Sequence, residues 1–322
     1  MRIVSLLPAA TDLVVTLGLA GDLVGRTHEC DWPPGALEHI PVVTRTSLPD
    51  GLSSREISAA VGGAHVGSSL YALDPAALAA LDADLILTQE LCDACAVSYA
   101  QVADAVRVAD GAARLVSLEP RTLGEVLGTL ATLGALTGRR TEAAAARVDA
   151  ERRLAAVAAA VSGRPRPRVV VLEWLDPIWP VGHWVPEQVA AAGGTEVLGT
   201  AGAHTDPVGW DRVVAAGPEV LVLAPCGFPP ERTLAELDVL TARPGWASLP
   251  AVRDGRVWVV DGPAYVNRPG PRVVRGVEVL AHVLHGIGTV TGTEAVPVGP
   301  PAYRPRHGSA SYRSGNGPAR DG

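Results

Sequence analysis

The chain has 322 residues, a formal net charge of -7 and a hydrophobic content of 48%. This length suits two compact lobes, and the apolar content excludes a chain that is disordered throughout. Basic residues are spread along a mildly acidic sequence, which excludes the concentrated positive charge typical of nucleic-acid-binding and membrane-surface proteins. No apolar stretch reaches the roughly 18 residues that a membrane span requires.

The N-terminal residues lack the basic region, apolar run and cleavage site of a secretory signal. We therefore expect a cytoplasmic protein with no membrane span and no nucleic-acid partner. The four cysteines are Cys30, Cys92, Cys95 and Cys226. In a reducing compartment, cysteines are more often thiols, redox groups or metal ligands than structural disulfides.

Residues 1–120 alternate short apolar strand patterns with helix patterns, which is typical of a parallel sheet covered by helices on both faces. The expected strands are 2–5, 23–26, 84–88 and 114–118, and the expected helices are 8–18, a short one from 74, and 97–108. The polar, glycine-rich stretch 47–69 predicts an inserted loop with one helical turn. Residues 1–120 are therefore predicted to form an N-terminal α/β lobe.

Residues 121–165 are predicted to form a helical linker. Thr122 and Glu125 have the spacing of a capping box, in which each side chain accepts a hydrogen bond from the backbone at the other residue. The alanine-rich stretch 141–161 predicts a helix of about 20 residues, long enough to span roughly 30 Å, the width of a small domain. Pro165 and Pro167 end the helical pattern.

A second alternating unit occupies residues 166–286. The expected strands are 168–172, 219–224 and 256–260, and the expected helices are 186–192, 210–216, 231–240 and 271–285. Residues 287–322 are rich in Gly, Pro and Ser without periodicity, which predicts a disordered tail. The predicted fold is thus an α/β protein with two parallel-sheet lobes joined by a long helical linker.

Ligands of open parallel sheets bind beyond the carboxyl ends of the strands, so the loops there should form a cleft between the lobes. Four of the seven tryptophans fall in these loops: Trp32, Trp174, Trp179 and Trp184. A Trp face suits stacking on a flat, partly polar ligand. The alternative is that these side chains cover the sheet ends as ordinary packing.

Two polar residues of the same loops are further candidates for ligand contact. Glu173 directly follows a predicted strand, where it could act as a base, an Arg partner or a hydrogen-bond acceptor. His183 lies ten residues further on. The segment from His204 to Pro207 could also contact a ligand as a loop, but it more naturally predicts a helix start, with Asp206 as its N-cap.

A metal site is predicted from His28, Cys30, Cys92 and Cys95. Cys92 and Cys95 are two residues apart, so one backbone turn could present both sulfurs to zinc or iron, or to each other. If the two loops are adjacent, His28 or Cys30 would complete a site with one open position, the mark of a catalytic or ligand-binding metal. The alternative is that these cysteines are small buried side chains and His28 is a hydrogen-bonded loop residue.

Several segments together carry a resemblance to a known family. They are 5–12 (SLLPAATD), 23–26 (LVGR) with 30–34 (CDWPP), 186–188 (PEQ) with 192–194 (AGG), and 218–223 (PEVLVL). In this order around a helical linker, over roughly residues 2–285, the chain resembles the class III substrate-binding proteins of ABC importers for cobalamin, haem and siderophores. The resemblance implies two lobes held by a rigid helix, with the ligand between them.

The resemblance also implies site residues and partners. Trp32, Trp179 and the loop around Tyr265 occupy positions that line the family's cleft, where a cobalamin-like corrinoid or another metal chelate would bind. Asp211 stands at the second-lobe position that docks on the ABC permease, but the first-lobe position holds Ala76, so permease docking is in doubt. With no signal sequence, the chain is most similar to a leaderless, cytoplasmic cobalamin-binding branch.

Two functional hypotheses follow. In the first, the protein binds a cobalamin-like corrinoid or another metal chelate in the cleft between its lobes and is not an enzyme. In the second, it is a cytoplasmic metalloenzyme or redox protein that holds zinc or iron at the Cys/His site, with Glu173 or Glu29 transferring protons.

Overall fold

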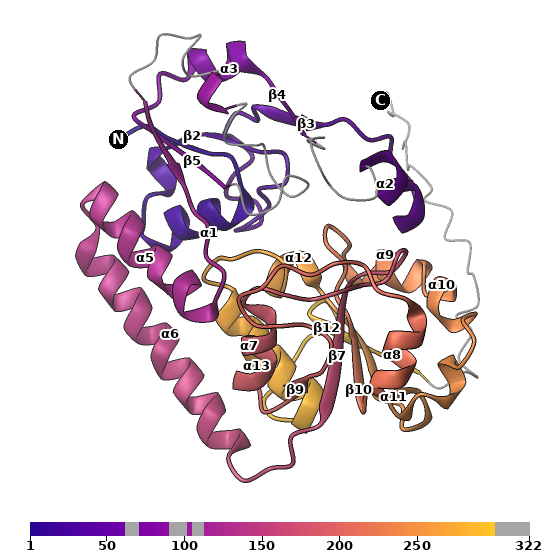
Figure 1. Cartoon of the computed structure of the whole chain (residues 1–322). Coiled ribbons are helices and arrows are strands. Elements are labelled where there is room, and N and C mark those ends of the chain that lie inside the picture. Colours follow the sequence, from indigo (N-terminus) through magenta and orange to yellow (C-terminus); the bar gives the residue numbers. More distant parts are fainter. Residues whose placement is uncertain (62–70, 90–101, 105–112, 300–322) are drawn as a thin grey trace, which may run out of the picture.

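The computed structural model describes residues 1–61, 71–89, 102–104 and 113–299. Figure 1 shows two α/β lobes, each built on its own sheet, with a pair of helices running along one side of both. The predicted fold class is confirmed. No helix in these ranges is both long enough and apolar enough to cross a membrane.

The N-terminal lobe is built on a four-stranded parallel sheet in the order β2-β1-β5-β6. Its elements are β1 (Ile3–Ser5), α1 (Pro8–Thr16), β2 (Leu23–Arg26), α3 (Pro75–Ala80), β5 (Leu85–Thr88) and β6 (Arg114–Ser117). Successive side chains of a strand point to opposite faces. Ile3 accordingly packs into the core on the α1 face, while Val4 packs with Leu78 of α3 on the other.

A separate hairpin of two antiparallel strands, β3 (Thr44–Thr46) and β4 (Tyr71–Leu73), lies outside this sheet. Between its strands the chain forms α2 (Ser54–Val61), a helix of eight residues where the sequence predicted a single turn. The Glu56 carboxylate starts this helix by accepting hydrogen bonds from the backbone N–H and the hydroxyl of Ser53, at 2.8 and 2.7 Å. Residues 62–70 lie outside the described ranges.

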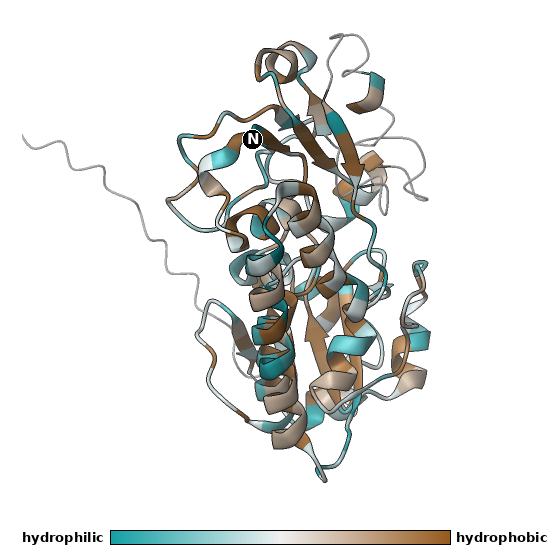
Figure 2. Cartoon of the chain, turned by 90° about the vertical axis from the view of Figure 1, so that its left-hand side faces the viewer, coloured by the Kyte–Doolittle hydropathy of each residue, from teal (hydrophilic) through white to brown (hydrophobic). Residues whose placement is uncertain are grey.

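The linker is a helical hairpin made of α5 (Leu123–Thr137) and α6 (Arg140–Val161). The predicted capping box of Thr122 and Glu125 is present, and Gly138 separates the two helices in the left-handed conformation, with φ of 74°. Figure 2 views the molecule from the side of these helices. Leu130 packs in the core of the N-terminal lobe and Val157 packs in the core of the C-terminal lobe, so the helical hairpin is anchored to both lobes by hydrophobic packing.

The C-terminal lobe has a sheet in the order β12-β11-β10-β7-β8, with β9 pairing with β7. Its strands are β7 (Arg168–Trp174), β8 (Trp179–Pro180), β9 (Thr195–Glu196), β10 (Val220–Leu223), β11 (Val257–Val260) and β12 (Ala295–Val298). Its helices are α7 (Val185–Ala191), α8 (Trp210–Ala216), α9 (Pro230–Ala235), α10 (Asp238–Thr241), α11 (Pro250–Arg253), α12 (Gly262–Tyr265) and α13 (Val273–His285). Strands β7, β10 and β11 are parallel, whereas β8 and β12 are antiparallel edge strands.

The prediction that the chain is disordered from residue 287 onward is wrong for β12. This strand pairs with β11, and its first residue, Ala295, is buried. The segment before it is anchored because Glu294 accepts hydrogen bonds from Arg275 at 2.8 and 2.9 Å. Pro297 is tolerated because an edge strand needs no N–H donor on its outer side. Residues 300–322 lie outside the described ranges.

The helix predicted over 97–108 is described only at residues 102–104, which are helical. Val102 is fully buried in the core beside Val4 and Ile86. The rest of that predicted helix, with the loop at 90–95, lies outside the described ranges.

Candidate ligand-binding site

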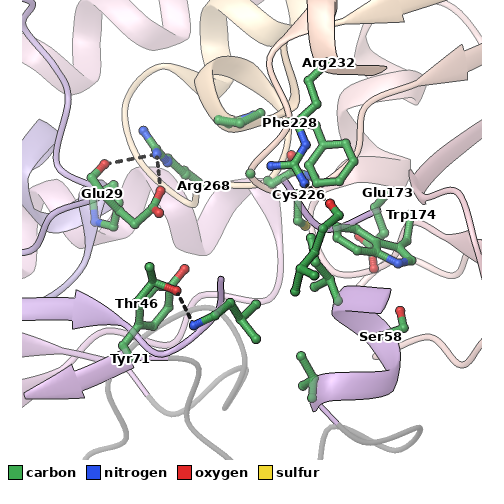
Figure 3. Close-up of a pocket in the computed structure, with 18 of the residues that line it drawn as sticks. Glu29, Thr46, Ser58, Tyr71, Glu173, Trp174, Cys226, Phe228, Arg232 and Arg268 are labelled. Atoms are coloured by element: carbon green, nitrogen blue, oxygen red, sulfur yellow. Dashed lines mark hydrogen bonds and ion pairs between the residues drawn. The ribbon is translucent and has the colours of Figure 1, made fainter. Parts of the chain in front are cut away.

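A pocket of about 400 Å³ lies between the two lobes. It is formed by the start of α1, the hairpin and its inserted segment, the end of β7, and the loops that follow β2, β5, β10 and β11. The end of β7 and these four loops lie at the carboxyl ends of parallel strands, the edge at which ligands of open α/β sheets bind. We refer to this cavity as the interlobe pocket (Figure 3).

Aromatic side chains of the C-terminal lobe form one wall of the interlobe pocket. The rings of Trp174, at the end of β7, and Phe228, after β10, lie 5.0 Å apart between centroids. Trp179 of β8 also lines the pocket, and its indole N–H donates to the carbonyl oxygen of Thr205 at 3.0 Å. Phe228 and Trp179 are buried, 1% and 7% exposed, whereas Trp174 is half-buried. The wall therefore offers a ligand mainly the indole face of Trp174, which the buried Phe228 ring supports from behind.

Arg232 of α9 lies beside this wall, with its guanidinium carbon 3.6 Å from the centroid of the Phe228 ring. One guanidinium nitrogen donates to the carbonyl oxygen of Leu52 at 2.8 Å. Among the described residues, no carboxylate lies within ion-pair distance of Arg232. Its positive charge is therefore available to an anionic group of a ligand.

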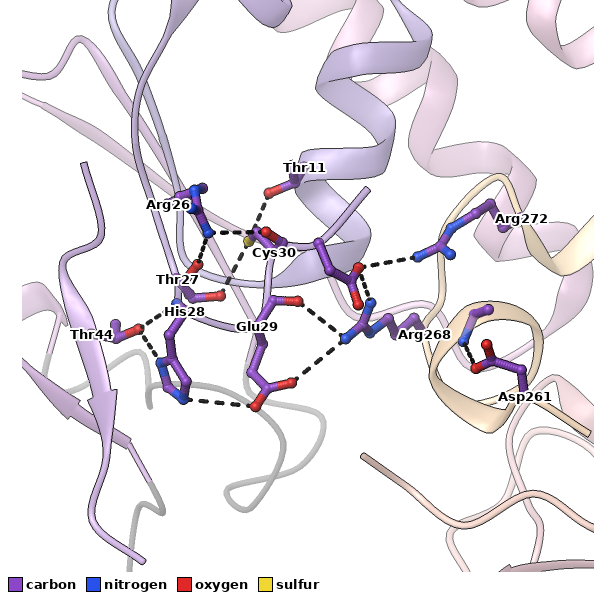
Figure 4. Close-up of polar contacts among 12 residues, drawn as sticks. Thr11, Arg26, Thr27, His28, Glu29, Cys30, Thr44, Asp261, Arg268 and Arg272 are labelled. Atoms are coloured by element: carbon purple, nitrogen blue, oxygen red, sulfur yellow. Dashed lines mark hydrogen bonds and ion pairs between the residues drawn. The ribbon is translucent and has the colours of Figure 1, made fainter. Parts of the chain in front are cut away.

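Arg268, on the opposite side of the pocket, has its charge compensated by the N-terminal lobe (Figure 4). Its guanidinium lies 2.6 Å from the Asp31 carboxylate and 3.6 Å from that of Glu29. Its neighbour Arg272 donates to Asp12 at 2.7 Å. These ion pairs join α1 and the loop after β2 to the C-terminal lobe, so they add to the contacts between the lobes.

A family model described as periplasmic binding protein matches residues 3–264. The chain belongs to the periplasmic binding protein family. Its function is accordingly the binding of a small-molecule ligand, as in substrate-binding proteins of the ABC-importer type. No curated protein matches the chain.

Solved structures with the same fold include the following three, each at most 23% identical in sequence to this periplasmic binding protein. A periplasmic haem-binding protein from Pseudomonas aeruginosa has 23% identity and a TM-score of 0.66, with 93% of this chain and 95% of that chain covered. The vitamin B12-binding protein BtuF of Vibrio cholerae has 21% identity and a TM-score of 0.64, with 88% and 96% covered. An ABC-type Fe3+-hydroxamate transport system from Saccharomonospora viridis has 23% identity and a TM-score of 0.62, with 88% and 93% covered.

In this periplasmic binding protein, three of the predicted ligand-binding residues meet in the interlobe pocket: Glu173, Trp174 and Trp179. Trp32 does not line it; its ring lies beneath the Arg272 guanidinium, 5.6 Å away. Tyr265 also lies outside the lining and packs against the core of the C-terminal lobe.

The last two predicted residues lie behind the pocket wall. The structure places Trp184 in the core, 5% exposed, with its indole N–H donating to the Val266 carbonyl at 2.9 Å. The ring of His183 stacks on Trp184 at 5.8 Å and lies 5.8 Å from that of His204. Neither His183 nor Trp184 lines the interlobe pocket.

Most residues that line the pocket were not chosen from the sequence, among them His204, Phe228 and Arg232. The segment from His204 was expected to start a helix, but α8 begins at Trp210 with Gly209 as its N-cap, which leaves His204 in a loop at the pocket. For Phe228 and Arg232, the sequence did contain a signal that could have pointed to the site. Phe228 is the only phenylalanine in the chain, and Arg232 follows it by four residues.

The predicted metal ligands His28 and Cys30 have protein partners of their own. His28 Nδ1 lies 2.8 Å from the hydroxyl of Thr44, and Cys30 Sγ lies 2.9 and 3.1 Å from the hydroxyls of Thr11 and Thr27 (Figure 4). Burial raises the pKa of the Cys30 thiol and so opposes the thiolate that a metal requires. Within the ranges that the structure describes, no three His, Cys, Asp or Glu residues are grouped to hold a metal.

Cys92 and Cys95 lie outside the described residues, so metal binding by this pair stays a prediction. If the pair binds zinc or iron, protein purified without oxygen should contain about one equivalent of metal, and Cys92→Ser/Cys95→Ser should lose it. Elemental analysis of both proteins checks this. Equal metal content in the two, or none in the wild type, would exclude the site.

The buried carboxylate of Asp12 gives a testable pH dependence. Loss of hydration raises its pKa to about 6 despite the neighbouring Arg272 guanidinium. Below about pH 4, Asp12 is protonated in the folded and unfolded states alike. Between about pH 4 and pH 6 the folded state keeps a proton that the unfolded state has released, so the free energy of unfolding falls as the pH rises.

Replacement of Asp12 by Asn should remove this fall, which amounts to at most about 3 kcal/mol. This fall is measured by urea unfolding of the wild type and of Asp12→Asn at several pH values between about 4 and 7, which gives the free energy of unfolding of each protein. The wild type should lose stability relative to the variant as the pH rises. If it gains stability instead, the Arg272 ion pair outweighs the loss of hydration.

Proposed function

We propose that this protein binds a metal chelate in the interlobe pocket, and that a cobalamin-like corrinoid is the first ligand to test. The observation that carries the proposal is a cavity of about 400 Å³ lined by the half-buried Trp174 and by Arg232, whose guanidinium stacks on the buried Phe228 ring. This volume falls within the range of small-molecule sites, roughly 300–1,000 Å³. A ligand larger than the cavity would extend into the opening between the lobes.

The chemistry of the wall supports a ligand with an extended apolar face and an anionic edge. Burying apolar area against the aromatic side chains contributes about 25 cal/mol per Å². The Arg232 guanidinium presents paired N–H donors that suit a carboxylate or phosphate oxygen. Corrinoids, haems and iron–siderophore complexes all combine a large, metal-bearing body with polar or charged groups at its margin.

The named ligands of structurally similar proteins point the same way. The Vibrio cholerae protein is a vitamin B12-binding protein, and the Pseudomonas aeruginosa protein binds haem. Each of these ligands is a metal chelate. At these identities the likeness supports the choice of ligand class to test, and the pocket residues carry the argument for binding.

Binding can be tested by titrating the purified protein with hydroxocobalamin, haem and ferrioxamine, followed by tryptophan fluorescence and visible absorbance. We expect saturable 1:1 quenching by one of them, with hydroxocobalamin the first candidate. Trp246→Phe is a suitable control because Trp246 packs in the core on Trp210, away from the pocket. Quenching that never saturates with any of the three would contradict the proposal.

The cytoplasmic location stays a prediction, to be tested by cell fractionation. The doubt about docking on an ABC permease also stays a prediction. Asp211, at the start of α8, and Ala76, at the start of α3, are both exposed at the surface, one on each lobe. A pull-down with an ABC permease, in which Ala76→Glu strengthens the interaction, would support the view that half of the docking pair is missing.

A further inference from the structure

The segment 47–61, which we call the strap, crosses from the N-terminal to the C-terminal lobe. It leaves the hairpin after Thr46 and carries α2. In Figure 1, α2 lies on the side of the molecule opposite α6, close to the C-terminal lobe. The lobes are therefore connected on both sides of the interlobe pocket, by the helical hairpin on one side and by the strap on the other.

Residues 52–55 of the strap bond to four side chains of the C-terminal lobe. The carbonyl oxygens of Leu52 and Ser54 accept from Arg232 and Trp174, at 2.8 and 3.1 Å. The other two contacts are the Ser54 N–H donating to the Glu236 carboxylate at 2.9 Å, and the Arg55 guanidinium 2.7 Å from Asp176. Two of the four partners, Arg232 and Trp174, are also residues of the pocket wall.

The strap also supplies much of the apolar lining of the interlobe pocket. Ile57 and Ser58 of α2 lie four and three residues before Val61, so the three side chains share one face of the helix, and all of them line the pocket. Leu48 and Leu52 extend this lining before the helix begins. A ligand in the pocket would thus touch the strap as well as the two lobes.

The contacts that hold the lobes are more extensive than those that hold the strap. The linker helices α5 and α6 pack into the hydrophobic cores of both lobes. In the strap, by contrast, the Arg55 side chain is 77% exposed, and exposed ion pairs stabilise weakly. A segment with few and partly exposed contacts opens at lower free energy than packed lobes do.

From these contacts we propose that the strap is a gate. It closes the interlobe pocket by bonding to the C-terminal lobe, and it detaches to admit or release a ligand while the angle between the lobes stays fixed. The proposal rests on the proposed function for the identity of the ligand. The attachment of the strap can be measured without any ligand.

The first experiment uses Cys226, a free thiol that lines the pocket, as a reporter of access. Arg55→Ala/Glu236→Ala removes two strap contacts that are outside the pocket lining, and Glu231→Ala, on the exposed side of α9, is the control. Labelling by a bulky maleimide, located by peptide mass spectrometry, should be about tenfold faster at Cys226 in the double variant. The control should label at the wild-type rate.

Hydrogen exchange on the same proteins shows whether the strap has detached. The amides of α2 should exchange faster in the double variant, while those of β1 and β7 should not change. If α2 exchanges faster and Cys226 labelling stays at the wild-type rate, the strap does not gate the pocket. If β1 and β7 also exchange faster, the lobes themselves have loosened and the proposal fails.

The second experiment measures stopped-flow association and dissociation of hydroxocobalamin and haem. For a gate, both rate constants should rise by a similar factor, about tenfold, with little change in Kd. A rise in the dissociation rate alone would mean that the strap only contacts the ligand, and would overturn the proposal. If neither probe binds, the proposed function fails, while the labelling experiment still decides on the strap.

Discussion

Replacement of Trp174 by Ala is expected to weaken binding of the metal chelate by about 30-fold or more. Trp174 stands at the end of β7, packs on Phe228 at 5.0 Å and faces the interlobe pocket. Aromatic anchors in a desolvated pocket typically contribute about 2 kcal/mol or more, which corresponds to this factor. Absorbance titration with the chelate that quenches the wild-type protein gives the two dissociation constants.

Two further variants separate the roles of the Trp174 side chain. Trp174→Phe keeps an aromatic face but removes the donor to the Ser54 carbonyl oxygen, so it should retain most of the affinity. Trp258→Ala is the matched control, because Trp258 lies on β11, is half-buried and faces His282 instead of the pocket. An affinity of Trp174→Ala equal to that of the control would show that Trp174 does not contact the ligand.

Replacement of Trp184 by Ala is expected to lower the free energy of unfolding by about 3–5 kcal/mol. Its side chain is 5% exposed within the core of the C-terminal lobe, beside Val185 and Val266. The substitution leaves a cavity, and it also removes the indole N–H that satisfies the carbonyl oxygen of Val266. Urea unfolding measures the change through the midpoint and its slope.

Trp184→Phe fills most of the cavity and should cost less, about 1–2 kcal/mol, largely for the lost hydrogen bond. The folded fraction of either variant should bind the chelate with nearly the wild-type affinity, since Trp184 does not line the pocket. A large loss of affinity with unchanged stability would instead restore Trp184 as a ligand-binding residue.

The strands and their order along the chain could be predicted because their signals are local. Apolar runs such as those of β7 and β10 are buried on both faces, and turn residues bound them closely. The capping box at Thr122 was equally readable, since all its partners lie within four residues. β12 was missed because its support comes from β11 and from Arg275, which are distant in the sequence.

The site was predicted only in part, for a related reason. The rule that ligands bind at the carboxyl ends of parallel strands identified the loops after β7, β10 and β11, and all three reach the pocket. It could not tell which side chains of a loop face inward. Trp174 and Trp179 face the pocket, while Trp184, five residues after Trp179, turns into the core.

The amino-acid sequence by itself determined the two α/β lobes, the helical connection and the strand ends where a ligand can bind. Periodicity and turn residues specify these, because they act over a few positions. Only the tertiary structure decided that the strap reaches across to Glu236, and that Arg268 is neutralised by Asp31 while Arg232 pairs with no carboxylate of the described residues. Such contacts join residues about 180 to 240 positions apart, and no local pattern encodes which distant charge will lie within 4 Å of another.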